Sequence, residues 1–456
     1  MSDSARTAHG GKRRPILIAL VLLVLSGMVA FYFLVGPGPM AFAKGTHVAL
    51  ADYHAANPTG VPAALAQESV LKRGEYLAKA ADCLVCHTAK DGQAYAGGFP
   101  FVLPFGTLYS TNITPDKITG IGNYSDAQFL AAMRRGIRQD GAHLYPAMPY
   151  TSYSYMTDAD ALAIKAYLFS LAPINARATP NELSFPFNQR WAMGIWSGIY
   201  NANKRFEPDT EQTAEWNRGA YVAEALAHCG ECHTPRNLAF ALNNRKKFGG
   251  ALTAGWRAYN ISSDKDTGVG AWQDEDLLQY LATGHAAGHG SAAGPMGEAV
   301  DESFSQLTPD DVRALLVYLR SVPETASSDL PAKLAAAAPD SHSDGPAASA
   351  SRGKIVYEGA CVSCHGWSGV SAISPYATLT GARAVNDPHA TNVAQVVLAG
   401  MRRTSPSGVL EMPAFGRAYS DAEIAAVANF VTTRFGASGS TLTAADVAKM
   451  RKETAQ

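Results

Sequence analysis

The spacing of apolar and polar residues predicts a long helix at the end of three similar stretches of the chain. In each stretch a capping residue with acidic neighbours, at Thr157, Thr308 or Ser420, precedes apolar positions at helical spacing. A short alanine-rich segment lies further upstream and predicts a second helix. The three C-terminal helices are expected over ALAIKAYLFSL (161–171), VRALLVYLRSV (312–322) and IAAVANFVTTRF (424–435). This pattern predicts an all-α fold of three tandem helical units.

The longest apolar run of the chain, Ile16 to Val35, follows several basic residues near the N-terminus. Twenty residues form a helix roughly 30 Å long, which matches the hydrocarbon core of a bilayer. The basic residues are expected to stay in the cytoplasm and the remaining chain to be exported. A cleaved signal peptide is the alternative, because Ala41-Phe42-Ala43 resembles a processing site. We favour a retained transmembrane helix before the three units.

Composition divides the rest of the chain. The stretch from Thr325 to Ser351 is rich in Ala, Ser and Pro, which predicts a flexible linker. The stretch from Pro173 to Glu215 is rich in aromatic residues, and we expect it to pack between two units. The expected segments are a cytoplasmic basic N-terminus (1–15), an anchor or signal sequence (16–36), the first unit (65–175), an aromatic connection (176–215), the second unit (216–324), the linker (325–350), the third unit (351–437) and a polar tail (438–456).

Repeated phrases relate the three units to one another. An Arg-Gly pair stands about ten residues before a cysteine pair in each unit, at Arg73-Gly74, Arg218-Gly219 and Arg352-Gly353. The first two units also share a loop, which begins at Asn112 in one and at Asn260 in the other, and continues to Thr-Gly-x-Gly. The first two units are therefore expected to resemble each other more than either resembles the third.

All six cysteines of the chain lie in three Cys-x-x-Cys-His motifs. Two thiols at this spacing can form thioethers to the vinyl groups on one porphyrin edge, and the next His can bind the iron. A single motif could also be half of a zinc site or a redox dithiol. Three copies with similar flanking sequence favour three covalently bound haems c. The predicted residues are Cys83, Cys86 and His87, then Cys229, Cys232 and His233, then Cys361, Cys364 and His365.

A methionine on the opposite face of each haem would complete the iron coordination and favour electron transfer. Met148, Met296 and Met412 each have a neighbouring proline and precede the C-terminal helix of a unit, so we assign them as the sixth ligands. The alternative for an individual methionine is core filling. At the second site His285 or His289 could compete with Met296.

The phrases RGEYLAKAADCLVCHT, LYPAMPY, FPFNQRW, GPMGEAV and MPAFGRAYSDAEIAAVANFV resemble the triple-haem cytochrome c subunit of bacterial membrane-bound alcohol, gluconate and related dehydrogenases. The resemblance covers roughly residues 65 to 440. It implies three cytochrome c-like domains, with the haem thiols and histidines at the nine motif positions and axial methionines at Met148, Met296 and Met412. The stretch from Gly366 to Pro388 fits the family pattern less well.

The resemblance implies an electron-transfer subunit that accepts electrons from a periplasmic catalytic dehydrogenase subunit and passes them to ubiquinone. That partner would be a quinoprotein, flavoprotein or molybdoprotein, so no substrate-oxidising site is expected on this chain. Donation to a terminal oxidase and a haem peroxidase-like activity are the competing functions. The haem domains are expected on the periplasmic side of the bacterial inner membrane. The net charge of -1 gives no reason to expect a nucleic-acid partner.

Overall fold

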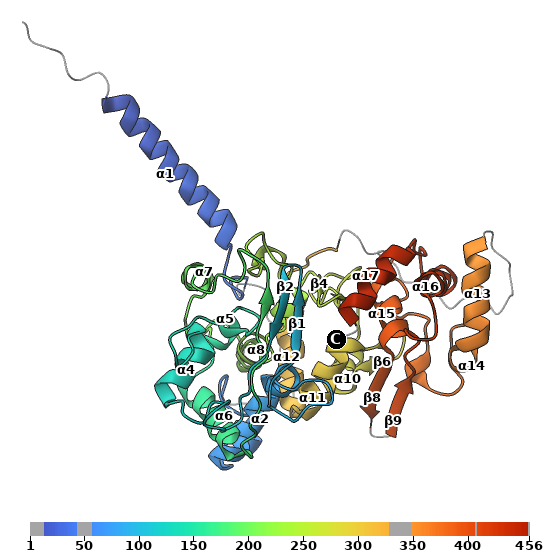
Figure 1. Ribbon diagram of the computed structural model, residues 1–456, viewed down its shortest axis with the longest axis horizontal. Helices are drawn as coiled ribbons and strands as arrows, with labels where there is room; N and C mark the ends of the chain where they lie inside the picture. Colours follow the sequence, from blue (N-terminus) through green and yellow to red (C-terminus); the bar gives the residue numbers. More distant parts are fainter. Residues whose placement is uncertain (1–12, 43–56, 328–347, 406–407, 455–456) are drawn as a thin grey trace, which may run out of the picture.

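The computed structural model describes residues 13–42, 57–327, 348–405 and 408–454, and its main body lies beside one projecting helix (Figure 1). Most of the predicted linker (325–350) and of the basic N-terminus (1–15) lies outside the described residues, as does Ala43 of the suggested processing site.

The projecting helix is α1 (Arg13–Val35), and its apolar side chains are exposed. Over the residues that the structure describes, no helix is both long and apolar enough to cross a membrane. The predicted transmembrane helix is therefore wrong. The prediction rested only on the length and apolar character of Ile16 to Val35 in the sequence.

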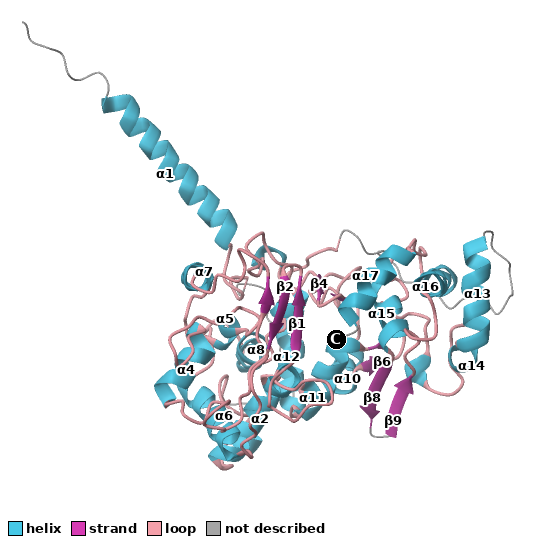
Figure 2. Cartoon of the chain, in the orientation of Figure 1, coloured by secondary structure: helices cyan, strands magenta, loops and turns pink. Residues whose placement is uncertain are grey.

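The all-α class is also wrong, because the described residues include short β-strands that pair in four small sheets (Figure 2). These strands are two to five residues long, and most form hairpins within the loops that connect helices. Such short strands leave no clear alternation of apolar and polar residues in the sequence. They are β1 (Pro100–Leu103), β2 (Gly106–Tyr109), β3 (Glu182–Leu183), β4 (Ala251–Thr253), β5 (Trp256–Ala258), β6 (His285–Ala286), β7 (Gly290–Ser291), β8 (Met401–Ser405) and β9 (Gly408–Met412).

The helices follow one another in three similar series. The first unit contains η1 (Ala63–Leu65), α2 (Val70–Ala80), α3 (Cys83–Cys86), α4 (Asp126–Arg135), α5 (Tyr150–Tyr153) and α6 (Asp158–Ser170), and α7 (Ala192–Tyr200) lies in the connection. The second contains α8 (Ala214–Tyr221), a π-helical turn η2 (Val222–Leu226), α9 (Gly230–His233), η3 (Asn244–Lys246), α10 (Asp274–Thr283), α11 (Gly294–Glu302), η4 (Phe304–Gln306) and α12 (Pro309–Ser321). The third contains α13 (Ala348–Ala360), α14 (Val362–His365), η5 (Pro375–Ala377), α15 (Thr391–Ala399), α16 (Asp421–Phe435) and α17 (Ala444–Thr454).

Each unit is organised around a close crossing of its first and last long helices, at the repeated Arg-Gly pair. The crossing pairs are α2 with α6, α8 with α12, and α13 with α16. A Cβ atom on Gly74, Gly219 or Gly353 would lie 2.0, 1.9 or 2.2 Å from a carbonyl oxygen of the crossing helix. Only glycine permits this approach, which explains why the pair recurs ahead of every cysteine motif.

The first two units share one hydrophobic core, whereas the third has its own. One cluster of buried side chains runs from Leu77 and Ile164 of the first unit to Trp216 and Leu316 of the second. The third unit holds two smaller clusters, one around Tyr357 and one around Ile424. The first two units are therefore one packing body, to which the third is attached.

Two tyrosine–aspartate hydrogen bonds join the first two units in a reciprocal manner. Tyr76 on α2 donates to Asp311 on α12 over 2.5 Å, and Tyr221 on α8 donates to Asp160 on α6. Each tyrosine lies three residues after the repeated arginine, and each aspartate three residues after the N-cap threonine of its helix. The two units therefore face each other through equivalent surfaces.

The aromatic connection packs only in part as expected. Phe206 is buried in the common core, and Trp196 packs edge-on against Tyr150. Phe185 and Trp191, however, are largely exposed. One end of the connection lies against the core, and the other end forms an apolar surface.

Candidate functional site

Each Cys-x-x-Cys-His motif forms a single helical turn. The amide of His87 donates to the carbonyl of Cys83 over 3.1 Å, and the matching bonds from His233 and His365 are both 3.0 Å long. Side chains three and four residues apart share one face of such a turn. The two sulfurs and the imidazole of each motif therefore point to the same side, as attachment to one porphyrin requires.

The three histidines are held by the same contact. Nδ1 of His87 lies 2.7 Å from the carbonyl oxygen of Thr111, that of His233 lies 2.6 Å from Tyr259, and that of His365 lies 2.6 Å from Ala377. A protonated Nδ1 that donates to a carbonyl fixes the ring and leaves Nε2 as the nitrogen for a metal. Burial lowers the pKa of all three histidines, which favours the neutral, ligating form.

The cysteines of the first two motifs lie deeper than those of the third. Burial raises the pKa of Cys83 and Cys229 to about 12, and that of Cys232 and Cys361 to about 11. Cys364 is exposed. Buried thiols of this kind stay protonated and unreactive toward solvent, which suits thiols reserved for a cofactor.

The loop repeated in the first two units closes over the motif histidine. The side-chain amide of Asn112 donates to the carbonyl of Ile174 over 2.7 Å, and Asn260 donates to Thr325 over 2.5 Å. Both acceptors follow the last helix of their unit, so each asparagine ties its loop to that segment. The loop supplies Thr111 or Tyr259, the carbonyl that holds the histidine, and the repeated Asn therefore acts on the site through the backbone.

The predicted methionines occupy three different kinds of local structure. Met148 stands in the turn before α5 and Met296 in the first turn of α11, and both are partly buried against the common core. Met412 ends strand β9 and is paired across the hairpin with Met401. Their roles as ligands stay predictions.

The competing histidines of the second unit have other partners. Nδ1 of His285 lies 3.0 Å from the hydroxyl oxygen of Ser291, and its ring packs on Tyr376 of the third unit. His289 stacks on Trp272 with ring centroids 3.7 Å apart, and its Nε2 lies 3.3 Å from Asp276. Each histidine thus has a partner in the second or the third unit, and ligation by either one stays an alternative.

The first and second motifs lie close together. The α5 helix after Met148 reaches the second motif, where the Thr151 hydroxyl lies 3.4 Å from Glu231, and α11, which carries Met296, packs against α3 of the first motif. Burial raises the pKa of Cys86, and the neighbouring Asp82 and Cys232 raise it further. The methionine segment of each unit therefore contacts the cysteine motif of the other.

The third unit contacts two segments of the second unit, the loop that holds His233 and the hairpin that carries His285. Tyr259, whose carbonyl holds His233, donates through its hydroxyl to the buried Asp387 over 3.3 Å. On the hairpin that carries His285, Ser291 donates to the carbonyl of Tyr376 over 3.1 Å. Tyr376 precedes Ala377, whose carbonyl holds His365. Backbone and side-chain contacts thus connect the second site to the third.

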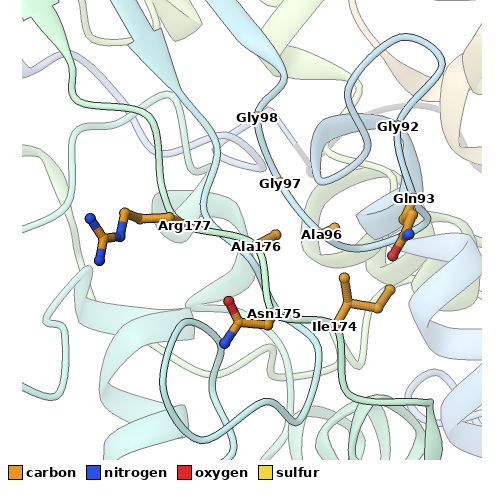
Figure 3. Close-up of a pocket in the computed structure, with 9 residues that line it drawn as sticks. All are labelled: Gly92, Gln93, Ala96, Gly97, Gly98, Ile174, Asn175, Ala176 and Arg177. Carbon is orange, nitrogen blue, oxygen red and sulfur yellow. The ribbon is translucent and has the colours of Figure 1, made fainter.

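The pocket drawn in Figure 3 lies apart from these contacts. Gly92, Gln93 and Gly98 line it from one loop, and Ile174 and Arg177 line it from the segment after α6. Its lining contains no cysteine, histidine or methionine. Among the described residues, no group of three or more His, Cys, Asp or Glu side chains could hold a bare metal ion.

The residues of the three motifs fit haem better than zinc. Each motif brings two thiols and one oriented imidazole to a helical turn, which is the donor set for thioether attachment and one axial bond. When bound, haem supplies a one-electron redox centre, while the chain orients the histidine and surrounds the site with apolar residues. The carbonyls of Thr111, Tyr259 and Ala377 were not foreseen from sequence, because any residue type can supply a carbonyl.

The chain is similar in sequence to known cytochrome c families and subunits. Residues 71–172 match the family described as cytochrome c, and residues 348–431 match cytochrome c oxidase, cbb3-type, subunit III. The chain is 40% identical over 416 residues to the fructose dehydrogenase cytochrome subunit of Gluconobacter japonicus, covering 87% of this chain and 85% of that protein. It is 38% identical over 411 residues to the gluconate 2-dehydrogenase cytochrome c subunit of Pantoea cypripedii, covering 85% and 91%.

A third relative is the cytochrome c subunit of alcohol dehydrogenase (quinone) from Gluconacetobacter polyoxogenes, with 36% identity over 400 residues and 85% coverage of each chain. These alignments extend well beyond a single cytochrome domain and include the connection between the first two units. The resemblance noted from the sequence is confirmed: this chain belongs to the family of cytochrome c subunits of dehydrogenases.

Proposed function

We propose that the chain is the electron-transfer subunit of a dehydrogenase complex and carries three covalently bound haems c. It accepts electrons from a catalytic subunit that is a quinoprotein, a flavoprotein or a molybdoprotein, and passes them to ubiquinone. It works at the periplasmic side of the bacterial inner membrane. Membership of a family of dehydrogenase cytochrome subunits supports the partner, and the motifs support the cofactor.

The observation that carries this proposal is the identical arrangement of the three motif histidines. Each imidazole is fixed by a backbone carbonyl at its Nδ1, and the two cysteines of its motif lie on the same helical turn. A carrier needs such a rigid ligand, because small changes in geometry between the oxidised and reduced states allow fast electron transfer. In this role His87, His233 and His365 are the proximal ligands, and Met148, Met296 and Met412 the opposite ones.

Replacing one methionine at a time tests the ligand assignment. Met148→Ala, Met296→Ala and Met412→Ala should each retain all the haem, because the thioethers do not depend on the sixth ligand, and should each lower the potential of one haem. Redox titration followed in the visible spectrum measures this, and Met401→Ala is the matched control for Met412. A variant with unchanged potential and spin state would exclude that methionine as a ligand.

Quinone reduction tests the direction of electron flow. Under anaerobic conditions the reduced holoprotein in detergent should be reoxidised by a soluble ubiquinone analogue. Reoxidation that occurs only with an added terminal oxidase would instead favour the oxidase-donor function. Abundant high-spin haem that binds carbon monoxide in the unaltered protein would favour a peroxidase-like enzyme, because such chemistry needs an open iron position.

A further inference from the structure

The exposed end of the aromatic connection forms an apolar surface together with a loop of the second unit. We call it the apolar face, and define it by Phe185, Phe187, Trp191, Ile195, Leu238 and Phe240. Trp191 is 67% exposed and Leu238 98% exposed. Large apolar side chains gathered on one surface mark an interaction site.

Side-chain and backbone contacts hold the two segments of the apolar face together. Phe105 of the first unit stacks on Phe187, with ring centroids 4.2 Å apart, and meets Phe240 edge-on at 5.2 Å. The indole of Trp196 donates to the carbonyl of Ala239 over 2.7 Å. Residues about fifty positions apart in the chain are thereby held side by side.

The charge around the apolar face is mainly basic, although Glu182, Glu207 and Glu231 stand just outside the ends of its two segments. Residues 185–205 contain three basic residues, residues 232–250 contain four, and neither stretch contains Asp or Glu. Some of these cations have protein partners, as Arg236 does with Glu231 and Lys247 with Glu224. Arg245 and Lys246 lie on the exposed rim. An apolar centre with a basic rim complements an anionic phospholipid surface.

The C-terminal end of α1, a helix with exposed apolar side chains, lies next to the apolar face. Asn237 donates to the carbonyl of Leu34 over 2.8 Å, and Arg245 donates to that of Tyr32 over 2.9 Å. Figure 1 shows α7 beside the end of α1 that meets the main body. The apolar face is thus continuous with a second exposed apolar surface, which gives a larger area for lipid than either would alone.

We propose that the apolar face docks on the surface of an anionic phospholipid bilayer, with Trp191 and Leu238 entering the boundary between headgroups and acyl chains. Tryptophan favours this boundary because its ring is largely apolar and its indole nitrogen is polar. Leu238 lies five residues after His233, so docking also brings the second cysteine motif close to the lipid. This inference rests on the proposed function at a membrane and specifies which surface meets it.

Single introduced cysteines test the docking, because haem attachment would consume all six natural cysteines. Trp191→Cys and Leu238→Cys are compared in the full-length holoprotein with Ile118→Cys and Ile355→Cys, which are 85% and 67% exposed elsewhere. The rate of modification by a membrane-impermeant maleimide is measured with and without vesicles. Phosphatidylglycerol-containing vesicles should slow the reaction at 191 and 238 about tenfold and leave the controls unchanged.

Vesicles of phosphatidylcholine alone, or high salt, should protect positions 191 and 238 less, because the basic rim then has no anionic surface to meet. Equal rates at all four positions would overturn the proposal. Slow modification of positions 191 and 238 without vesicles would also overturn the proposal. If it occurs in the protein alone, the occupant is a second copy of the chain; if it occurs only after the catalytic subunit is added, the occupant is that subunit. Reduction of a soluble quinone in detergent does not need the apolar face, so failure here is distinct from failure of the proposed function.

Discussion

The contact between the first and second units differs in kind from the contact between the second and third. The first contact is reciprocal, with matching Tyr–Asp bonds and one continuous core. The second is mainly polar: Arg403 of the third unit reaches Asp301 over 2.8 Å and donates to the carbonyls of Ala292 and Thr283. The difference indicates that the first two units fold together and that the third docks on them as a separate body.

Arg218 on α8 and Asp311 on α12, both of the second unit, form a fully buried ion pair beside the first contact. Both side chains are 0% exposed, and the guanidinium binds both carboxylate oxygens, over 2.7 and 2.6 Å. Arg218 also donates to the carbonyl of Gly60 over 2.8 Å. The equivalent carboxylate of the first unit, Asp160, accepts from the amide of Gly60 over 2.9 Å. One stretch before the first unit therefore contacts both equivalent positions.

The largest expected effect comes from removing one partner of that pair. Asp311→Ala leaves a buried guanidinium without its carboxylate and should lower the free energy of unfolding by about 3–5 kcal/mol. Denaturant unfolding of the holoprotein measures this. The matched change at the second contact, Asp301→Ala, should cost only about 1–2 kcal/mol, because Asp301 is 21% exposed and Arg403 keeps two carbonyl acceptors. Equal losses would contradict the distinction between the two contacts.

The helix crossings provide the next test. Gly219→Ala places a methyl group against Ala314 and should cost about 3 kcal/mol, as overpacking does in cores. In calorimetry it should lower the transition of the first two units together, whereas Gly353→Ala should lower only that of the third. Gly359→Ala, on the same helix as Gly353 but with open space around its Cα, should be neutral or slightly stabilising. A shift of all transitions by Gly353→Ala would show that the third unit is not separate.

The sequence revealed features that are local and repeated. The N-caps Thr157, Thr308 and Ser420 are confirmed, because each hydroxyl accepts the amide three residues later. The cysteine motifs form the helical turns that their spacing requires. Both kinds of signal depend on residues within one turn of each other, so spacing along the chain reports them directly.

Contacts between distant residues were not predictable in the same way. Tyr76 and Asp311 are 235 positions apart, and neither residue type announces a partner. Arg403 looks like any surface arginine in the sequence, yet it is buried between two units. The short strands were missed because they are too brief to show a period of two. The exposed end of the aromatic connection was misjudged, because a high aromatic content predicts that side chains are buried but does not identify the surface that would bury them.

A pH measurement sharpens the difference between the first two units. Asp82 and His228 each stand directly before the first cysteine of their motif, and both have a left-handed backbone conformation. Burial, together with the nearby charges of Glu298 and Glu302, raises the pKa of Asp82 to about 8, whereas burial lowers that of His228. Because the raised pKa favours protonated Asp82 in the fold, stability should fall as pH rises from roughly 4 to 8.

Asp82→Asn should remove that fall and be about 2 kcal/mol more stable than the unaltered protein near pH 8, with little difference near pH 4. Urea unfolding of the holoprotein across this range measures the gap. His228→Asn is the control and should leave the slope above neutral pH unchanged, because its neutral imidazole has no proton to lose there. A constant gap between Asp82→Asn and the unaltered protein at all pH values would mean that Asp82 does not titrate in this window.

The smallest expected effects come from the reciprocal tyrosines, and they test how equivalent the two halves of the first contact are. Tyr76→Phe removes one donor from Asp311, which keeps the Arg218 fork, and should cost about 1 kcal/mol. Tyr221→Phe removes a donor from Asp160, which keeps the amide of Gly60, and should cost about 2 kcal/mol because no guanidinium compensates. Thermal unfolding of both variants and of the double variant resolves the difference. Equal costs would mean that the two halves are energetically alike despite the buried guanidinium of Arg218, and the contact would then be symmetric in energy as well as in geometry.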